Sequence, residues 1–90
     1  MFLTRYSSDM GRQALVGPIT SYIAGELRAQ KSRHRWSLDW IADRSGLPRS
    51  TVDRALKGEA AISVEVLIPL CAAMQMDAAA LMRDAREATS

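Results

Sequence analysis

Two glycines, Gly46 and Gly58, restrict the fold of this 90-residue chain more than any other feature. They lie in the stretch SGLPRSTVDRALKG, residues 45–58, in which Pro48 follows the first glycine and the second closes the run. Glycine readily takes the left-handed conformation that ends a helix, and proline is accepted at a first helical position. The spacing predicts a short helix over residues 48–57, joined to a preceding helix by about four residues.

Helical signals recur along the rest of the chain, whereas strand signals are weak because β-branched residues rarely alternate. Besides 48–57, the apolar spacings and caps predict helices over 18–31, from Ser37 to about residue 45, over 64–74 and over 78–87. We therefore expect an all-α fold, a compact five-helix bundle over residues 18–90. Residues 1–17 lack a clear period, and we expect an irregular or mobile N-terminal segment there.

Particular residues define the ends and the buried faces of these helices. Ser37, Ser63 and Asp77 are suited to cap the second, fourth and fifth helices, and Trp36 can pack on Ile41 as a hydrophobic staple. The inward residues expected are Ile19, Ile23 and Leu27 in the first helix, Val52, Ala55 and Leu56 in the third, Val66, Leu67, Leu70 and Met74 in the fourth, and Leu81 and Ala85 in the fifth. Pro69 should bend the fourth helix, because it removes a hydrogen bond to the carbonyl of Glu65.

Composition excludes several classes of function. The chain has one cysteine, Cys71, and one histidine, His34, which excludes an internal disulfide and an ordinary zinc site. No nucleophile, base or metal is arranged for catalysis, so we expect neither an enzyme nor a cofactor. The chain has no apolar run of the ~20 residues that cross a bilayer and no signal-peptide pattern, which predicts a cytoplasmic protein without membrane contact.

Charge is distributed unevenly along the sequence. Residues 28–57 contain eight basic and three acidic side chains, whereas residues 58–90 contain two basic and five acidic ones. A basic block between neutral and acidic flanks is typical of a domain that presents one face to a polyanion.

The segments over 37–57 have the outline of a helix-turn-helix, in which the second helix enters the major groove of DNA. Ala42 supplies a small residue where the helices touch, Gly46 the turn, Leu47 an apolar plug, and residues 49–51 short polar or basic side chains at the start of the recognition helix. Residues 37–82, beginning SLDWIADRSGLPRSTVDRALKG, resemble the five-helix DNA-binding domain of the phage repressor and Cro type. The resemblance implies a transcriptional regulator, such as a phage or prophage repressor, that binds double-stranded operator DNA.

Several positions depart from the pattern of that family. Arg35 and Gln75 stand where the family usually has helix-ending glycines, and Gln30 replaces a customary leucine. Pro48 cannot cap the third helix in the way that the usual serine or threonine does, which leaves the start of this helix open. Trp40 occupies a position that is usually polar, and we expect it to be buried.

The resemblance and the side-chain chemistry together predict the DNA contacts. Arg49 suits the two acceptors on a guanine edge, and Thr51 can offer its methyl group to a thymine. Asp53 either holds Arg49 as its i to i+4 partner or accepts a hydrogen bond from a cytosine amino group. The complete set of expected base-reading residues is Arg49, Ser50, Thr51, Asp53 and Arg54, and the expected phosphate-binding residues are Lys31, Arg33, Arg35, Ser37 and Lys57.

Two other interpretations of the same stretch stay open. GLPRSTVDRAL also resembles the recognition helix of winged-helix regulators, which need two β-strands after it. Alternatively, the domain is a protein-binding adaptor or antirepressor that retains the fold. For a DNA-binding protein, palindromic operators imply a weak homodimer, formed through Leu81, Met82 and Ala85 of the last helix or through the first 17 residues.

Overall fold

The computed structural model describes residues 17–90, which form five α-helices and no strand. In chain order these are α2 (Pro18–His34), α3 (Leu38–Ser45), α4 (Arg49–Lys57), α5 (Val64–Ala73) and α6 (Ala78–Thr89). The predicted all-α five-helix bundle is thus confirmed. Because a helix, α5, follows α4 where a winged-helix protein needs two strands, that alternative is wrong. Apart from Gly17, the N-terminal segment predicted to be irregular lies outside the described residues.

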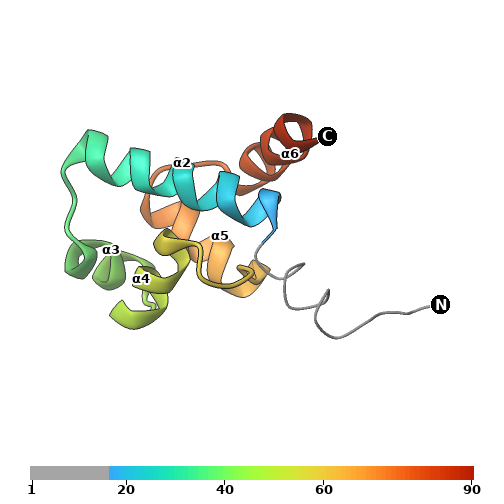
Figure 1. Ribbon diagram of the computed structural model, residues 1–90. Coiled ribbons are helices and arrows are strands. Elements are labelled where there is room, and N and C mark those ends of the chain that lie inside the picture. The colour runs from blue at the N-terminus through green and yellow to red at the C-terminus, as the bar shows by residue number, and fades with distance from the viewer. Residues whose placement is uncertain (1–16) are drawn as a thin grey trace.

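The helices form a bundle in which α2 is the longest element (Figure 1). α2 packs against α4 and α6, α3 packs against α4 and α5, and α5 packs against α6. α3 and α4 therefore lie together at one end of the bundle, and α6 lies beside α2 at the other end (Figure 1). Among residues 17–90, no other helix covers the outer face of α4.

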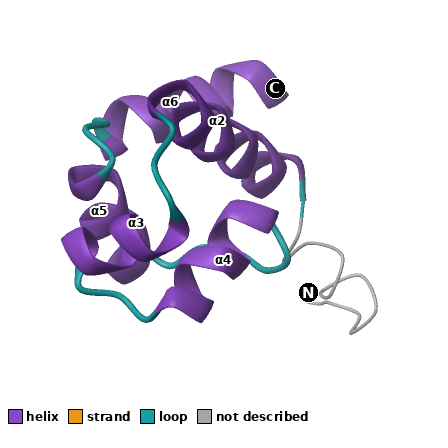
Figure 2. Cartoon of the chain, turned by 90° about the vertical axis from the view of Figure 1, so that its left-hand side faces the viewer, coloured by secondary structure: helices purple, strands orange, loops and turns teal. Residues whose placement is uncertain are grey.

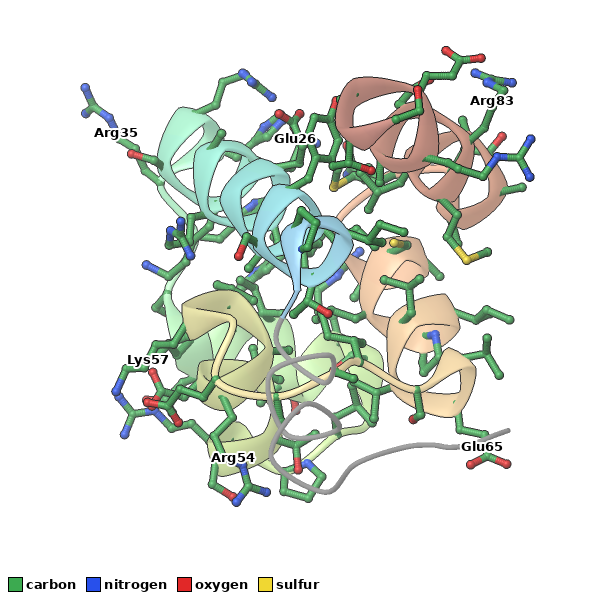
Figure 3. The ribbon with its side chains drawn as sticks, turned by 45° about the vertical axis from the view of Figure 1, so that its right-hand side comes forward. Glu26, Arg35, Arg54, Lys57, Glu65 and Arg83 are labelled. Atoms are coloured by element: carbon green, nitrogen blue, oxygen red, sulfur yellow. The ribbon has the colours of Figure 1, made fainter. Side chains whose placement is uncertain are left out.

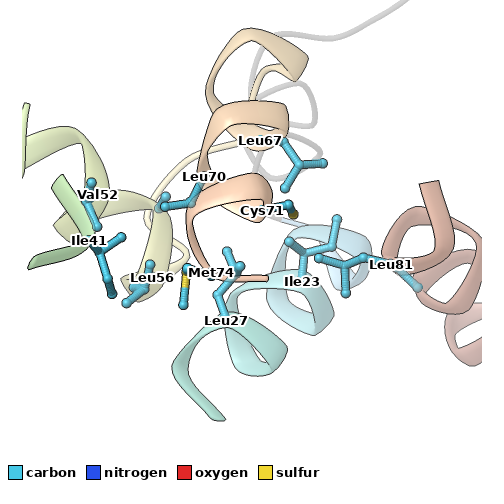
Figure 4. Packing of buried hydrophobic residues seen from close by; sticks show 12 residues of the cluster. Ile23, Leu27, Ile41, Val52, Leu56, Leu67, Leu70, Cys71, Met74 and Leu81 are labelled. Carbon is cyan, nitrogen blue, oxygen red and sulfur yellow. The ribbon is translucent and has the colours of Figure 1, made fainter. Parts of the chain in front are cut away.

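The core lies between all five helices, with α5 crossing its centre (Figure 4). Leu27, Ile41, Leu70 and Met74 are completely buried in it, and Leu81 closes it on the α6 side. The predicted inward residues are confirmed with two exceptions. Ile19 is 46% exposed although it shares a helical face with Ile23, because it lies in the first turn of α2, beyond the edge of the core. Val66 is only half-buried.

Side-chain caps begin two of the helices, as predicted. The Ser37 hydroxyl accepts a hydrogen bond from the Trp40 amide at 3.0 Å, and the Asp77 carboxylate accepts from Ala79 at 3.0 Å. Ser63 occupies the N-cap position of α5, but its side chain makes no capping bond. Pro48 occupies the N-cap position of α4, so this helix begins at Arg49 and the expected start at residue 48 is wrong by one position.

Four helix ends are closed by residues in the left-handed conformation. Gly46 and Gly58 have φ of 76° and 69°, as their predicted role as helix stops requires. Arg35 and Gln75 have φ of 58° and 60°, so the two non-glycine replacements adopt the backbone shape that glycine favours. α2 consequently continues to His34, three residues beyond its predicted end.

Gly58 also permits a close approach between helices. An added Cβ at this position would lie 3.1 Å from the Cβ of Ala24 in α2, whereas one at Gly46 would meet no atom within 4 Å. Polar side chains further tie α2 to its neighbours, since Arg28 donates to the Leu56 carbonyl at 2.6 Å and Gln30 donates to the Met74 carbonyl at 3.0 Å. The replacement of an apolar residue by Gln30 thus satisfies a carbonyl at the end of α5.

α5 is the most apolar helix and continues through Pro69 without interruption. Its inward residues, Leu67, Leu70 and Cys71, are buried in the core, and this burial stabilises a helix that contains a proline. Within residues 17–90, no single helix is long and apolar enough to cross a membrane. α5 and α6 meet that criterion only as a pair, and the chain bends by 112° between them.

Candidate nucleic-acid interface

A tight turn fixes α4 against α3 (Figure 2). The Gly46 amide donates to the Ala42 carbonyl at 2.9 Å, which ends α3, and the Leu47 amide donates to the Ser45 hydroxyl at 3.3 Å. Leu47 is half-buried against the core, in the position of the predicted apolar plug. On the other side of the turn, α4 buries Val52, Ala55 and Leu56 in the core.

The opposite face of α4 is polar and points away from the bundle. Arg49, Ser50, Arg54 and Lys57 are exposed, whereas Thr51 and Asp53 are half-buried. Figure 3 shows Arg54 and Lys57 projecting outward from this helix. All five residues predicted to read bases therefore lie on one short helix, and the exposed ones can be reached from solvent.

The ion pairs on this face differ from the predicted one. Arg49 pairs with Asp39 in the first turn of α3, with Nε 3.1 Å from Oδ1. Asp53 pairs with Lys57, with Oδ2 3.0 Å from Nζ. The expected Arg49–Asp53 pair is thus wrong, because the turn brings Asp39 within reach of Arg49 while Lys57 lies one helical turn beyond Asp53.

The electrostatics of Lys57 follow from its acidic neighbours. Its hydrogen bond to Asp53 and the negative charges of Asp53 and Glu59 raise the pKa of Lys57, so that the ammonium group keeps its charge. Lys57 and Lys31 line the same surface hollow, of about 290 Å³, between α2 and α4. The structure thus brings together two of the predicted phosphate-binding residues.

The other predicted phosphate-binding residues are dispersed. The Arg33 guanidinium donates to the Gln30 side chain, and Gln30 in turn contacts the end of α5. Figure 3 shows Arg35 at the far end of α2, well separated from Arg54 and Lys57. Ser37 uses its oxygen to cap α3, which leaves its hydroxyl proton free to be donated elsewhere.

An aromatic stack covers the corner between α2 and α3. The Trp36 ring lies 4.3 Å from the His34 ring and 4.6 Å from the Trp40 ring, nearly parallel to both. The Arg44 guanidinium lies 4.7 Å from the centre of the Trp40 ring, within the range of a cation–π contact. With these contacts Trp40 is half-buried, so the expectation that it is buried is confirmed only in part.

Two residues of this region were not among the predicted contacts. Asp39 shows no sequence signal of its role, because its partner Arg49 belongs to another helix. Arg28 belongs to the basic block, but only the crossing of α2 and α4 places it at the Leu56 carbonyl. Residues 17–90 contain no group of three or more His, Cys, Asp and Glu side chains placed to hold a metal ion.

The geometry described above, with α3 and α4 joined by a glycine turn and a polar outer face on α4, defines a helix-turn-helix domain. Residues 23–85 match the sequence model of a family described as a helix-turn-helix domain, and this region makes up more than half of the chain. The chain therefore belongs to the helix-turn-helix domain family, whose members bind DNA to regulate transcription.

A comparison with solved structures agrees with the family assignment. The crystal structure of the clp gene regulator ClgR from C. glutamicum superposes with a TM-score of 0.66, covering 80% of this chain and 94% of that chain. The two sequences are 18% identical, so the likeness establishes a shared fold. No curated protein matches the sequence significantly.

Proposed function

We propose that this protein is a sequence-specific regulator of transcription, of the phage or prophage repressor and Cro kind, that inserts α4 into the major groove of operator DNA. The observation that carries the proposal is the two-sided character of α4. Its inner face is locked into the core by Val52, Ala55 and Leu56, while its outer face presents Arg49, Ser50 and Arg54 to solvent. A rigid helix with short polar and forked basic side chains suits base edges in the major groove.

Each base-reading residue has a chemical role in this proposal. Arg49 donates to a guanine edge, Ser50 bonds a base edge or a phosphate, and Thr51 offers its methyl group to thymine. Asp53 accepts from a cytosine amino group, using carboxylate lone pairs that Lys57 leaves free. Arg54, one turn beyond Ser50, reads a second base or anchors a phosphate.

Phosphate contacts supply affinity without sequence preference in this proposal. Lys31 and Lys57 are the best supported, because they line one hollow beside α4. Ser37 can donate its hydroxyl proton to a phosphate at the start of α3, where the helix dipole favours an anion. Arg33 and Arg35 lie apart from this group and reach DNA only if the duplex extends past the α2–α3 corner.

Selection of bound sequences from a random duplex library tests the proposal directly, because it yields the preferred half-site. Arg49→Ala should then cost ~1 to 3 kcal/mol of operator affinity and relax the preference at one base pair. Lys57→Ala should weaken binding to all sequences alike and reduce the dependence of affinity on salt. Operator affinity that is unchanged in Arg49→Ala would refute its assignment as a reading residue.

A protein-binding adaptor or antirepressor is the second candidate, since the fold alone does not determine the ligand. Against it stand the exposed guanidinium groups of Arg49 and Arg54, which an adaptor has no need to keep. Binding to random duplex that vanishes in ~0.2 M salt, with no residual sequence preference, would favour the adaptor.

We also propose a weak homodimer, because palindromic operators pair with two-fold symmetric proteins. The interface expected on α6 needs revision, since Leu81 and Ala85 are only 5% and 0% exposed, and both belong to the core. Met82 remains available and lines a groove of about 280 Å³ with Ile19 and Val64, whose side chains are also exposed. Sedimentation that finds a strict monomer, both free and on operator DNA, would exclude this dimer.

A further inference from the structure

One ion pair connects α3 with α4. The closest atoms of the pair are Oδ1 of Asp39 and Nε of Arg49, 3.1 Å apart. Arg49 is the first residue of α4, and Asp39 lies in the first turn of α3. The contact therefore joins the start of one helix to the start of the other across the turn.

The end of Arg49 suited to guanine is its pair of terminal nitrogens. The two terminal nitrogens carry four of the five N–H donors of a guanidinium, and together they form a fork that matches the O6 and N7 atoms of guanine. Within residues 17–90, the Arg49 side chain makes this ion pair and no hydrogen bond. Because arginine has many rotamers, a carboxylate that holds Nε reduces the conformational freedom that is lost when the fork binds a base.

We propose that Asp39 is a positioning residue for Arg49, through which α3 contributes to sequence preference without touching a base. The inference rests on the proposed function. Asp53, the carboxylate of α4 itself, pairs with Lys57 and not with Arg49. The side chains of Asp39 and Arg49 are 81% and 63% exposed, and a pair this exposed contributes little to folding stability. Its effect is therefore expected in DNA binding.

Removal of the Asp39 charge should change two properties in opposite directions. The protein loses one negative charge beside DNA, so affinity for random duplex should increase at low salt. At the same time Arg49 loses its support, so preference at the base pair that it reads should decrease. A purely structural role of Asp39 would not produce this combination.

The test compares Asp39→Asn with Asp43→Asn in the 90-residue chain. Asp39 and Asp43 are exposed and four residues apart on α3, so both variants remove one carboxylate charge from the same side of this helix, but only the first removes a contact of Arg49. Each is titrated against the selected half-site, a half-site changed at the base pair that Arg49 reads, and random duplex. Melting of both variants, followed by circular dichroism, checks that they fold like the wild type.

We expect Asp39→Asn to lose about three- to tenfold of the discrimination between the two half-sites, a part of what a bidentate arginine–guanine contact provides. Asp43→Asn should also raise affinity for random duplex but keep this discrimination. In an Arg49→Ala background, Asp39→Asn should change discrimination no further, because the two residues act as a unit.

Two results would overturn the inference for different reasons. If Arg49→Ala abolishes the preference and Asp39→Asn keeps it at the wild-type level, Asp39 does not position Arg49, although the proposed function holds. If the wild-type protein itself binds both half-sites and random duplex equally, the proposed function fails and the role of Asp39 fails with it.

Discussion

The contrast between Gly46 and Gly58 gives a quantitative test of how closely α2 and α4 approach each other. Both glycines have positive φ, 76° and 69°, but only an alanine at position 58 would place its Cβ 3.1 Å from the buried Ala24 Cβ. At position 46 the new Cβ would meet no atom within 4 Å. Both substitutions therefore place alanine in the left-handed conformation, but only Gly58→Ala also crowds a neighbouring side chain.

The magnitudes follow from these two terms. The left-handed conformation destabilises the folded state by about 1–2 kcal/mol for an L-residue. Replacing glycine also reduces the conformational freedom of the unfolded chain, which offsets about 0.4–1 kcal/mol of this loss. Gly46→Ala should therefore lower the free energy of unfolding by about 1 kcal/mol. Gly58→Ala adds overpacking between two helices, typically about 1–3 kcal/mol, for a total of about 2–4 kcal/mol.

Thermal and urea unfolding followed by circular dichroism measure both changes. In a domain of this size, 1 kcal/mol corresponds to a shift in Tm of about 4–8 °C. Gly58→Ala should thus melt well below Gly46→Ala. Equal losses for the two variants would refute the argument, because the close approach of α4 to Ala24 would then have no energetic consequence.

Three further predictions concern the free energy of unfolding and its dependence on pH. Arg35→Gly and Gln75→Gly should each raise the free energy of unfolding by about 0.5–1 kcal/mol in urea titrations, because glycine relieves the left-handed strain at a smaller entropic cost; a loss of stability would contradict this. Arg28→Ala should cost about 1 kcal/mol, because it removes the bond to the Leu56 carbonyl, and unchanged unfolding would show that solvent replaces that bond. Burial raises the pKa of the Cys71 thiol above its ordinary value of 9.0, so stability should decrease as pH rises beyond 9.0, where the unfolded chain loses this proton and the folded chain keeps it. Cys71→Ala should reduce that decrease, and a wild-type slope in the variant would assign it to other groups.

The helices themselves could be predicted from the sequence because their signals are local. Ser37 and Asp77 cap their helices with the next few backbone amides, and Gly46 ends α3 by its own conformation. The buried faces followed from spacings of three and four residues. The bounds were less certain at Arg35 and Pro48, where the usual glycine and serine or threonine are replaced.

The candidate site was predictable only in part, because its contacts join different helices. The basic outer face of α4 follows from its own sequence, whereas the pairing of Arg49 with Asp39 depends on the turn geometry. The i to i+4 spacing favoured Asp53 as the partner of Arg49. The same spacing also allows Asp53 to pair with Lys57, and the structure contains the Asp53–Lys57 pair. Likewise, Lys31 and Lys57 line one hollow only because α2 packs against α4.

The aromatic stack has an optical consequence. Trp36 and Trp40 are the two tryptophans of the chain, and their rings lie 4.6 Å apart at an interplanar angle of 12°. All indole absorption and fluorescence of the protein therefore originates at the corner between α2 and α3, and the two transitions couple. An unlabelled sample thus carries a local signal that can separate the opening of this corner from the melting of the helices elsewhere.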